Sequence, residues 1–327
     1  MGTLPMNKER ERLLLLLGGG WITNMGNAFL DLGLVELINQ ASQNYQCYVL
    51  SNTQRWIFDR VSKLLEFMTR GKKASASIFK LQQFVAADFV AIHGACLGMD
   101  WIKLHGEKIS ALVKRGAKLL IIGGGMTSKA YRDKKDIKET KRFLEKVKPY
   151  VLVSRDEITF ETFKEFAEYS YNGIDCAFFI NDAVKPPHLD CPPYVVFNFD
   201  KSKEPNIDTI LPDKDVRIVR THHSYFYSFK TLPSYYTKDN VLISDIPYDY
   251  LAIYANTCAT YSNRIHACVV TVSYGKPARL FTDNPRSFLF ERVGLGEITR
   301  ELAVLDKRRV QEEKRRQIEF LRAILSS

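Results

Sequence analysis

The sequence predicts an α/β protein with doubly wound parallel sheets in two domains. Short apolar segments of strand length alternate with longer amphipathic segments, which is typical of parallel sheets covered by helices. The length of 327 residues exceeds that of most single cores. A proline-rich stretch, with four prolines between Pro186 and Pro193, interrupts the alternation. We therefore expect one domain over residues 1–188 and a second over residues 189–327.

The composition limits the classes of partner. An apolar fraction of 46% with 12% aromatic residues is typical of a folded globular protein. The formal charge of +10 favours acidic partners, such as phosphorylated metabolites or an anionic membrane surface. No nucleic-acid-binding motif is present, so we expect no nucleic acid. The six cysteines are scattered without a CxxC pair, which argues against a metal site or disulfides and favours a cytoplasmic location.

The first unit is a strand, a glycine-rich turn and a helix. Leu13–Leu17 is apolar but far too short to span a membrane, so we interpret it as a strand. Gly19 and Gly20 would let the backbone approach a ligand closely, while Asn24 and Asn27 offer amide contacts at the start of the helix. The turn matches neither GxGxxG nor a P-loop. A tight turn that binds no ligand is the alternative interpretation.

The alternation continues through the first half of the chain. Expected strands cover 46–51, 84–93, 117–126, 150–154 and 171–180, and expected helices cover 53–68, 101–115 and 129–148. Gly124 and Gly125 lie where one strand ends, so we count them as substrate-binding candidates.

Arg155 follows another strand and precedes a helix. The structural alternative is that Asp156 or Thr159 caps this helix while Arg155 pairs with a neighbouring carboxylate. We expect Asp175 at a turn.

The stretch 257–282 contains the strongest candidate site. It predicts a strand over Thr257–Tyr261, a helix over Arg264–Tyr274 and a strand over Ala278–Phe281. If Ser262 or Asn263 caps the helix, Arg264 and His266 lie in its first turn, beyond the carboxyl end of a strand. Open α/β sheets bind ligands at such positions, and a helix N-terminus with an arginine suits an anion.

Two further segments are informative. His222 and His223 follow a probable strand, and because adjacent residues point to opposite faces we expect surface burial and no shared metal. From Thr299 to the end we expect one charged helix. We favour packing of this helix on the first domain, with membrane contact or subunit pairing as alternatives.

Several motifs together resemble the polysaccharide pyruvyl transferase family. The strongest match is SNRIHACVVTVSYGKPARLF, which resembles the S-x-R-L-H-A signature and the turn that follows it. Supporting matches are GGGWITNMGNAFLDLGLVELI, IIGGGMTS, SRDEIT and GIDCAFFI, in the same order along the chain. The resemblance implies a GT-B-like architecture, in which two Rossmann-like domains face a cleft. It also implies phosphoenolpyruvate as donor and no metal or organic cofactor.

The resemblance assigns site residues by position. Arg155, Arg264 and His266 match family residues that bind the donor or take part in catalysis, and Ser262 opens the signature. Arg286 keeps the positive charge where the family commonly has lysine, whereas Asn27 replaces a family aspartate.

The expected function is transfer of pyruvate, as a ketal, to a glycan or lipid-linked glycan in cell-surface polysaccharide biosynthesis, with peripheral contact to an anionic membrane as an option. Alternatives are a GT-B glycosyltransferase that uses a nucleotide sugar, or a non-catalytic protein that binds glycans or anions on the same fold.

Overall fold

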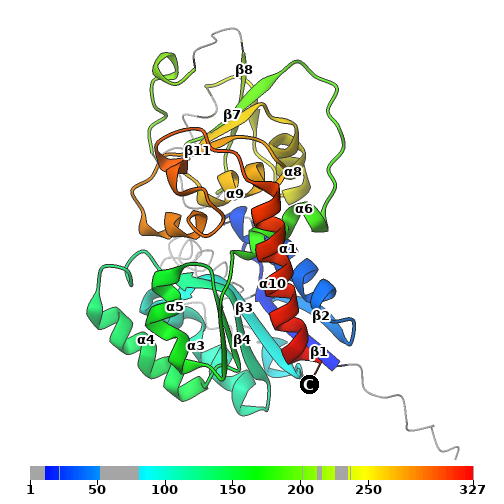
Figure 1. Cartoon of the computed structure of the whole chain (residues 1–327), viewed down its shortest axis with the longest axis vertical. Coiled ribbons are helices and arrows are strands. Elements are labelled where there is room, and N and C mark those ends of the chain that lie inside the picture. Colours follow the sequence, from blue (N-terminus) through cyan, green and yellow to red (C-terminus); the bar gives the residue numbers. More distant parts are fainter. Residues whose placement is uncertain are drawn as a thin grey trace, which may run out of the picture.

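The computed structural model contains two parallel sheets, one built by each half of the chain (Figure 1). The structure describes residues 12–21, 23–51, 81–200, 202–211, 216–224, 235 and 237–326. The predicted helix over 53–68 lies outside these residues.

The first sheet has six parallel strands in the order β2-β1-β3-β4-β5-β6. They are β1 (Arg12–Gly18), β2 (Tyr45–Ser51), β3 (Phe89–Leu97), β4 (Lys118–Met126), β5 (Val151–Ser154) and β6 (Tyr169–Asn172). The associated helices are α1 (Gly26–Ala41), α3 (Met99–Lys114), α4 (Lys134–Val147) and α5 (Glu157–Phe163). The leucines from Leu14 to Leu17 on β1 are almost completely buried, as expected for a strand covered on both faces.

The second sheet has five parallel strands in the order β11-β10-β7-β8-β9. They are β7 (Tyr194–Asn198), β8 (Arg217–Thr221), β9 (Val241–Leu242), β10 (Ala259–Ser262) and β11 (Ala278–Leu280). Helices α8 (Pro247–Asn256) and α9 (Ile265–Ser273) accompany this sheet. The α/β prediction is confirmed.

Three predicted boundaries are wrong, and a single side chain gives the local reason for two of them. The strand expected over 84–93 begins at Phe89 and continues to Leu97. The strand expected over 171–180 ends at Asn172, because the Asp175 side chain accepts a hydrogen bond from the Ala177 amide and starts a helical turn. That turn is η3 (Cys176–Phe179), and α6 (Ile180–Ala183) follows it.

The C-terminal helix α10 (Lys307–Leu325) starts later than the expected Thr299. Its N-cap is Asp306, whose carboxylate accepts a hydrogen bond from the Arg308 amide, and Ala303 forms a bridge with Ala278 before the helix begins. Figure 1 shows α10 running alongside both halves of the molecule. On the first half, Arg322 donates to the Gln40 carbonyl at the end of α1.

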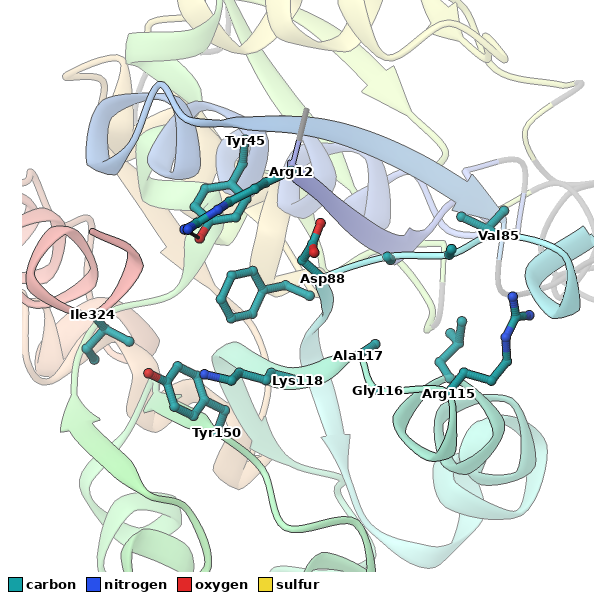
Figure 2. A pocket seen from close by; sticks show the side chains of 14 residues that line it. Arg12, Tyr45, Val85, Asp88, Arg115, Gly116, Ala117, Lys118, Tyr150 and Ile324 are labelled. Atoms are coloured by element: carbon teal, nitrogen blue, oxygen red, sulfur yellow. Dashed lines mark hydrogen bonds between the residues drawn. The ribbon is translucent and has the colours of Figure 1, made fainter. Parts of the chain in front are cut away.

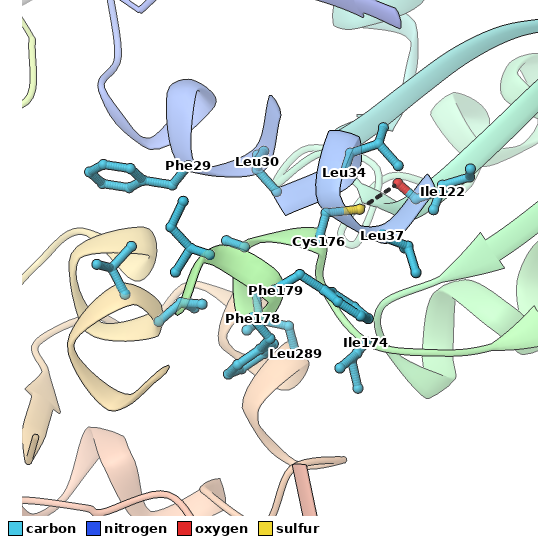
Figure 3. Packing of buried hydrophobic residues seen from close by; sticks show 14 of the residues in the cluster. Phe29, Leu30, Leu34, Leu37, Ile122, Ile174, Cys176, Phe178, Phe179 and Leu289 are labelled. Atoms are coloured by element: carbon cyan, nitrogen blue, oxygen red, sulfur yellow. Dashed lines mark hydrogen bonds between the residues drawn. The ribbon is translucent and has the colours of Figure 1, made fainter. Parts of the chain in front are cut away.

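The two halves share one hydrophobic core, part of which Figure 3 shows. Phe29 and Leu34 of α1 belong to the same cluster as Phe178 of η3 and Leu289 of the second half. Gly33 makes the close contact between α1 and η3 possible, because a Cβ atom there would lie 2.1 Å from the carbonyl oxygen of Cys176. This packing fixes the chain just after Asp175, which the candidate active site uses.

Candidate active site

Arg264 is positioned by the end of β10. Ser262, the last residue of that strand, pairs with Asn198 on β7. Its hydroxyl donates to the Asn198 carbonyl at 3.1 Å and accepts from the Arg264 amide at 2.8 Å. The helix cap differs from the prediction: Arg264 itself is the N-cap of α9, in extended conformation and without a side-chain cap. The Ser262 hydroxyl binds the amide of the N-cap residue and no amide within the helix, so it does not cap α9 and instead holds Arg264 at the strand edge.

The Arg264 guanidinium forms a buried ion pair with Asp200, just beyond the end of β7. Arg264 Nε lies 2.5 Å from Asp200 Oδ1, and Asp200 is completely buried. Burial opposes ionisation of this carboxyl, but the nearby Arg264 outweighs it and lowers the pKa of Asp200. Arg264 Nη1 is also 3.4 Å from the Asn24 amide oxygen. The second half therefore presents a guanidinium that reaches the turn before α1.

His266 lies in the first turn of α9 and faces the first half of the chain. Its Nε2 atom is 3.6 Å from Asp175 Oδ2 and has no hydrogen-bond partner in the described part of the chain, although the side chain is buried. Gly26 allows this approach, since a Cβ atom there would lie 2.8 Å from His266 Nδ1. Burial lowers the pKa of His266, and the positive charges of Arg155 and Arg286 lower it further against the opposing effect of Asp175. The imidazole is therefore neutral at neutral pH in the unliganded protein.

Arg155 and Asp175 form a second ion pair, and it is completely buried. Arg155 Nη1 donates to Asp175 Oδ2 at 2.9 Å, the same oxygen that faces His266. Burial opposes ionisation of Asp175, but His266 and Arg155 outweigh it and hold its pKa well below the ordinary value. Gly125 makes room for the guanidinium, because a Cβ atom there would lie 2.4 Å from Arg155 Nε. One carboxylate thus brings Arg155 and His266 together.

The alternative interpretation of the Ser154-Arg155-Asp156 segment, a helix cap with an ion-paired arginine, agrees with the contacts in the structure. Asp156 caps α5 by accepting from the Thr159 amide at 2.8 Å, and Arg155 pairs with a carboxylate. However, the ion pair with Asp175 uses only one nitrogen of the Arg155 guanidinium, Nη1. Arg155 Nε and Nη2 are buried and have no hydrogen-bond partner among the described residues. Buried unpaired donors are costly, and they are common where a ligand completes the set.

A cavity of about 270 Å³ lies between the two halves at this point. Three basic side chains line it, those of Arg264, His266 and Arg286. The other polar residues of its lining include Asn24, Ser202, Asn263 and Asn284. Asp283 is the one carboxylate among the described residues that line it.

Arg286 enters the cavity from the 3₁₀ turn η5 (Pro285–Phe290), capped by the Asn284 side chain. Asn284 also accepts and donates across the cleft to the Ser128 hydroxyl. Burial, with Arg155 nearby, lowers the pKa of Arg286 to about 10, and no described residue forms a hydrogen bond with its Nε. Arg286 therefore stays charged at neutral pH in a site that is already positive.

The other predicted site residues do not line this cavity. Gly19 and Gly20 have φ values of 84° and 72°, so they serve a tight turn, and Asn27 donates to the Gly19 carbonyl within it. Gly124 and Gly125 are buried within β4. Ser262 is completely buried and acts on Arg264, whereas Arg155 lies behind the cavity wall next to Asp175.

Sequence reasoning missed both carboxylates of the ion pairs. Asp200 directly follows the apolar run Tyr194–Phe199, so its place at a strand end was a usable signal. Asp175 was placed at a turn, but nothing local indicated that Arg155 and His266 would meet there. The expected surface burial of His222 and His223 is wrong: both are in the interior, with exposed fractions of 0% and 1%.

His223 lines the cavity and contacts Tyr254, a residue of the hydrophobic core that the two halves share. Its ring contacts the Tyr254 hydroxyl at 2.5 Å, and burial lowers its pKa to about 3, so it is neutral. Its carbonyl accepts from the Met25 amide at 2.8 Å.

The turn before α1 is held by another carboxylate that sequence reasoning passed over. Asp31 accepts from the Gly19 amide and from the Trp21 indole, and it contacts His93 on β3. These contacts help to fix the shape of the glycine turn.

With this geometry established, comparison with known proteins identifies the family. The family model for polysaccharide pyruvyl transferases matches residues 16–285. The chain belongs to this family. The match includes every residue of the Arg155, Asp175, Asp200, Arg264 and His266 network. No curated protein sequence matches the chain at a significant level.

Solved structures of low sequence identity share the GT-B-like fold of this pyruvyl transferase family member. The S. aureus MnaA–UDP co-structure has a TM-score of 0.54 at 12% identity, covering 95% of this chain and 90% of that one. A putative UDP-N-acetylglucosamine 2-epimerase from Listeria monocytogenes has a TM-score of 0.54 at 11% identity, covering 96% and 91%. The UDP-GlcNAc 2-epimerase from Methanocaldococcus jannaschii has a TM-score of 0.52 at 11% identity, covering 96% and 98%. At these identities the likeness concerns the fold alone.

Among the described helices, none combines the length and the apolar character needed to cross a membrane.

Proposed function

We propose that this family member transfers pyruvate from phosphoenolpyruvate to two hydroxyls of a glycan or glycolipid acceptor, forming a cyclic ketal. The observation that carries the proposal is a set of buried nitrogens without a hydrogen-bond partner among the described residues: those of His266 and Arg286 on the cavity, with those of Arg155 behind them. His266 and Arg286 line a small cavity whose only described carboxylate is Asp283, and Arg155 lies behind its wall. Phosphoenolpyruvate bears a carboxylate and a phosphate close together, so it supplies the missing acceptors and negative charge.

The proposal assigns direct donor contacts to Arg264 and Arg286, which line the cavity. Arg264 is held by Asp200 through Nε, so the rest of its guanidinium fork is oriented before a ligand arrives. Arg155 lies behind the cavity wall, next to Asp175. Its role in the proposal is to fix Asp175 and to add positive charge to the site, which favours a dianion over a neutral ligand.

His266 is assigned to proton transfer or to holding the phosphate. An anionic donor next to it raises the pKa of the imidazole, so the ligand itself charges the histidine. A proton delivered to the methylene carbon gives an oxocarbenium-like centre at C2, to which one acceptor hydroxyl adds. The C2–O bond to phosphate then breaks, and the second hydroxyl closes the ketal.

The protons of this reaction balance. Two hydroxyl protons are released, one replaces the proton delivered to the methylene carbon, and the other leaves on phosphate. Asp283, the carboxylate that lines the cavity, is our candidate for accepting a hydroxyl proton. Asn24 and Asn263 are suited to hydrogen-bond the other hydroxyls of the acceptor sugar.

Thermal-shift measurements test the donor. Phosphoenolpyruvate should raise the melting temperature, and Arg286→Ala should abolish the rise. UDP-GlcNAc is the comparison ligand, since the fold neighbours include an epimerase whose structure was determined with UDP-GlcNAc. Stabilisation by UDP-GlcNAc alone would contradict the proposal and favour a nucleotide-sugar enzyme.

Mass spectrometry tests the reaction. Candidate acceptors incubated with the protein and phosphoenolpyruvate should gain a pyruvate ketal, with equimolar release of phosphate. Donor binding without any product across lipid-linked and free acceptors would point to a non-catalytic anion-binding protein.

A further inference from the structure

A pocket of about 450 Å³ lies at the opposite end of the first sheet from the candidate active site (Figure 2). All strands of this sheet are parallel, and the pocket is at their amino ends, whereas Arg155 follows the carboxyl end of β5. The length of a seven-residue strand, roughly 20 Å, separates the two edges. A ligand in this pocket is therefore outside the cleft.

Aromatic and cationic side chains alternate along this edge of the sheet. In the spatial order of the strands they are Tyr45, Arg12, Phe89, Lys118 and Tyr150. Arg12 donates to the Tyr45 hydroxyl at 2.9 Å, and Lys118 Nζ lies 4.0 Å from the centre of the Tyr150 ring. The Tyr45 and Phe89 rings meet edge to face with centroids 5.2 Å apart. The row thus holds two cations in place against rings.

Arg12 and Lys118 are both available to bind an anionic ligand. Among the described residues, no carboxylate forms an ion pair with Arg12 or Lys118, and both side chains are exposed. Asp88 is the one acidic residue of the described pocket lining, and its Oδ2 atom accepts from the Leu13 amide at 2.7 Å. Because Arg115 also contributes to the lining, cations outnumber carboxylates.

The pocket also has room for a ring-shaped ligand. Its lining includes the small residues Ala86, Ala87, Gly116 and Ala117. Figure 2 shows Arg12 with Tyr45 on one wall and Lys118 with Tyr150 on the facing wall, with Asp88 between them. A volume of this size is within the range of small-molecule sites.

We propose that this pocket binds a carboxylate-bearing sugar unit of an acidic glycan. The paired cations match the carboxylate, the ring faces and edges match the apolar face of a pyranose, and Asp88 can accept from sugar hydroxyls. An anionic lipid surface fits less well, because the cations line a hollow.

The choice of a glycan rests on the proposed function. A polymer that already carries pyruvate ketals has carboxylates, and holding it at this edge raises the local concentration of its next acceptor unit at the cleft.

The test uses the full chain and calorimetric titration with tetragalacturonic acid, with neutral maltotetraose as the comparison ligand. The acidic oligosaccharide should bind and the neutral one should not. Lys118→Ala should weaken binding about tenfold, as expected for the loss of one contact to a charged group. Lys138→Ala is the matched control, because it removes an exposed lysine on α4 away from the pocket. Arg12→Gln is the second variant, and unfolding temperatures of all variants report whether they fold.

Several results would overturn the proposal: no binding of tetragalacturonic acid, equal binding of maltotetraose, or equal affinity in Lys118→Ala. Binding that is lost in Arg286→Ala but kept in Lys118→Ala would place the ligand in the cleft instead. Sedimentation with phosphatidylglycerol vesicles that depends on Lys118, without oligosaccharide binding, would show a lipid surface to be the partner. If phosphoenolpyruvate fails to bind while tetragalacturonic acid still depends on Lys118, the proposed function fails and the edge site stands.

Discussion

The two buried ion pairs of the candidate active site differ in their access to solvent. Arg155–Asp175, from the first half of the chain, is completely buried, whereas the Arg264 guanidinium of Arg264–Asp200 lines the cavity. In the first pair the arginine is a fixed part of the interior, and Asp175 connects it to His266. In the second pair the carboxylate is the fixed part and the arginine is presented to a ligand. Arg155 and Asp175 therefore hold the site in place, whereas Arg264 is the arginine that can contact a ligand.

The largest expected effect is on stability and concerns the first pair. Asp175→Asn leaves the Arg155 charge buried without a counter-charge, which should reduce the free energy of unfolding by about 3–5 kcal/mol. Urea denaturation measures it. Asp200→Asn is the comparison variant. It should reduce the free energy of unfolding by less, because the Arg264 guanidinium lines the cavity and is not enclosed in the interior. Equal losses in both variants would remove the distinction between the pairs.

The second pair should affect activity more than stability. Arg264→Lys keeps the charge but loses the planar fork, so kcat/KM for phosphoenolpyruvate should fall about 10²- to 10³-fold with little change in melting temperature. Steady-state phosphate release measures the first quantity and thermal unfolding the second. Wild-type kinetics in this variant would mean that Arg264 does not contact the donor.

His266 connects the two pairs, and its titration should appear in donor binding. Its pKa in the free protein is below the ordinary value because the site is buried and positively charged. A bound anion raises that pKa, so binding takes up a proton. Between the two pKa values, affinity should therefore fall as pH rises, by up to about tenfold per pH unit.

Calorimetry in buffers of different ionisation enthalpy, from about pH 5 to 8, measures this proton uptake. His266→Gln should retain only the titration of the donor phosphate itself. The same pH slope in wild type and variant would exclude His266 from the site.

The smallest expected effect is on KM for the donor, and it comes from the hydrogen bond between Asn24 in the first half and Arg264 in the second. Asn24 Oδ1 is 3.4 Å from Arg264 Nη1, which is a long hydrogen bond. Asn24→Ala should therefore raise KM for the donor only about two- to fivefold, with kcat nearly unchanged. Asn263→Ala, on the same cavity but on the second half, is the matched control for the acceptor side. A loss in Asn24→Ala as large as that in Arg264→Lys would show that the turn before α1 orients the arginine.

The fold was largely predictable from the sequence because its signals are local. Apolar runs such as Leu13–Leu17 identify strands wherever they occur. Two of the three boundary errors occur where one side chain decides the boundary. Asp175 ends the extended segment after β6, and Asp306 starts α10 after residues that pair with β11. A single hydrogen bond of this kind leaves no periodic pattern.

By itself the sequence determined that Arg264 and His266 stand at the start of a helix behind a strand, and that Arg155 stands at an equivalent place in the first half. Only the tertiary structure decided that one Asp175 oxygen faces both Arg155 and His266. These residues come from three segments, and their meeting depends on how closely α1 packs on η3. The reason is physical: charge and hydrogen-bond networks depend on distances of a few ångströms, which long-range packing sets and local propensity does not.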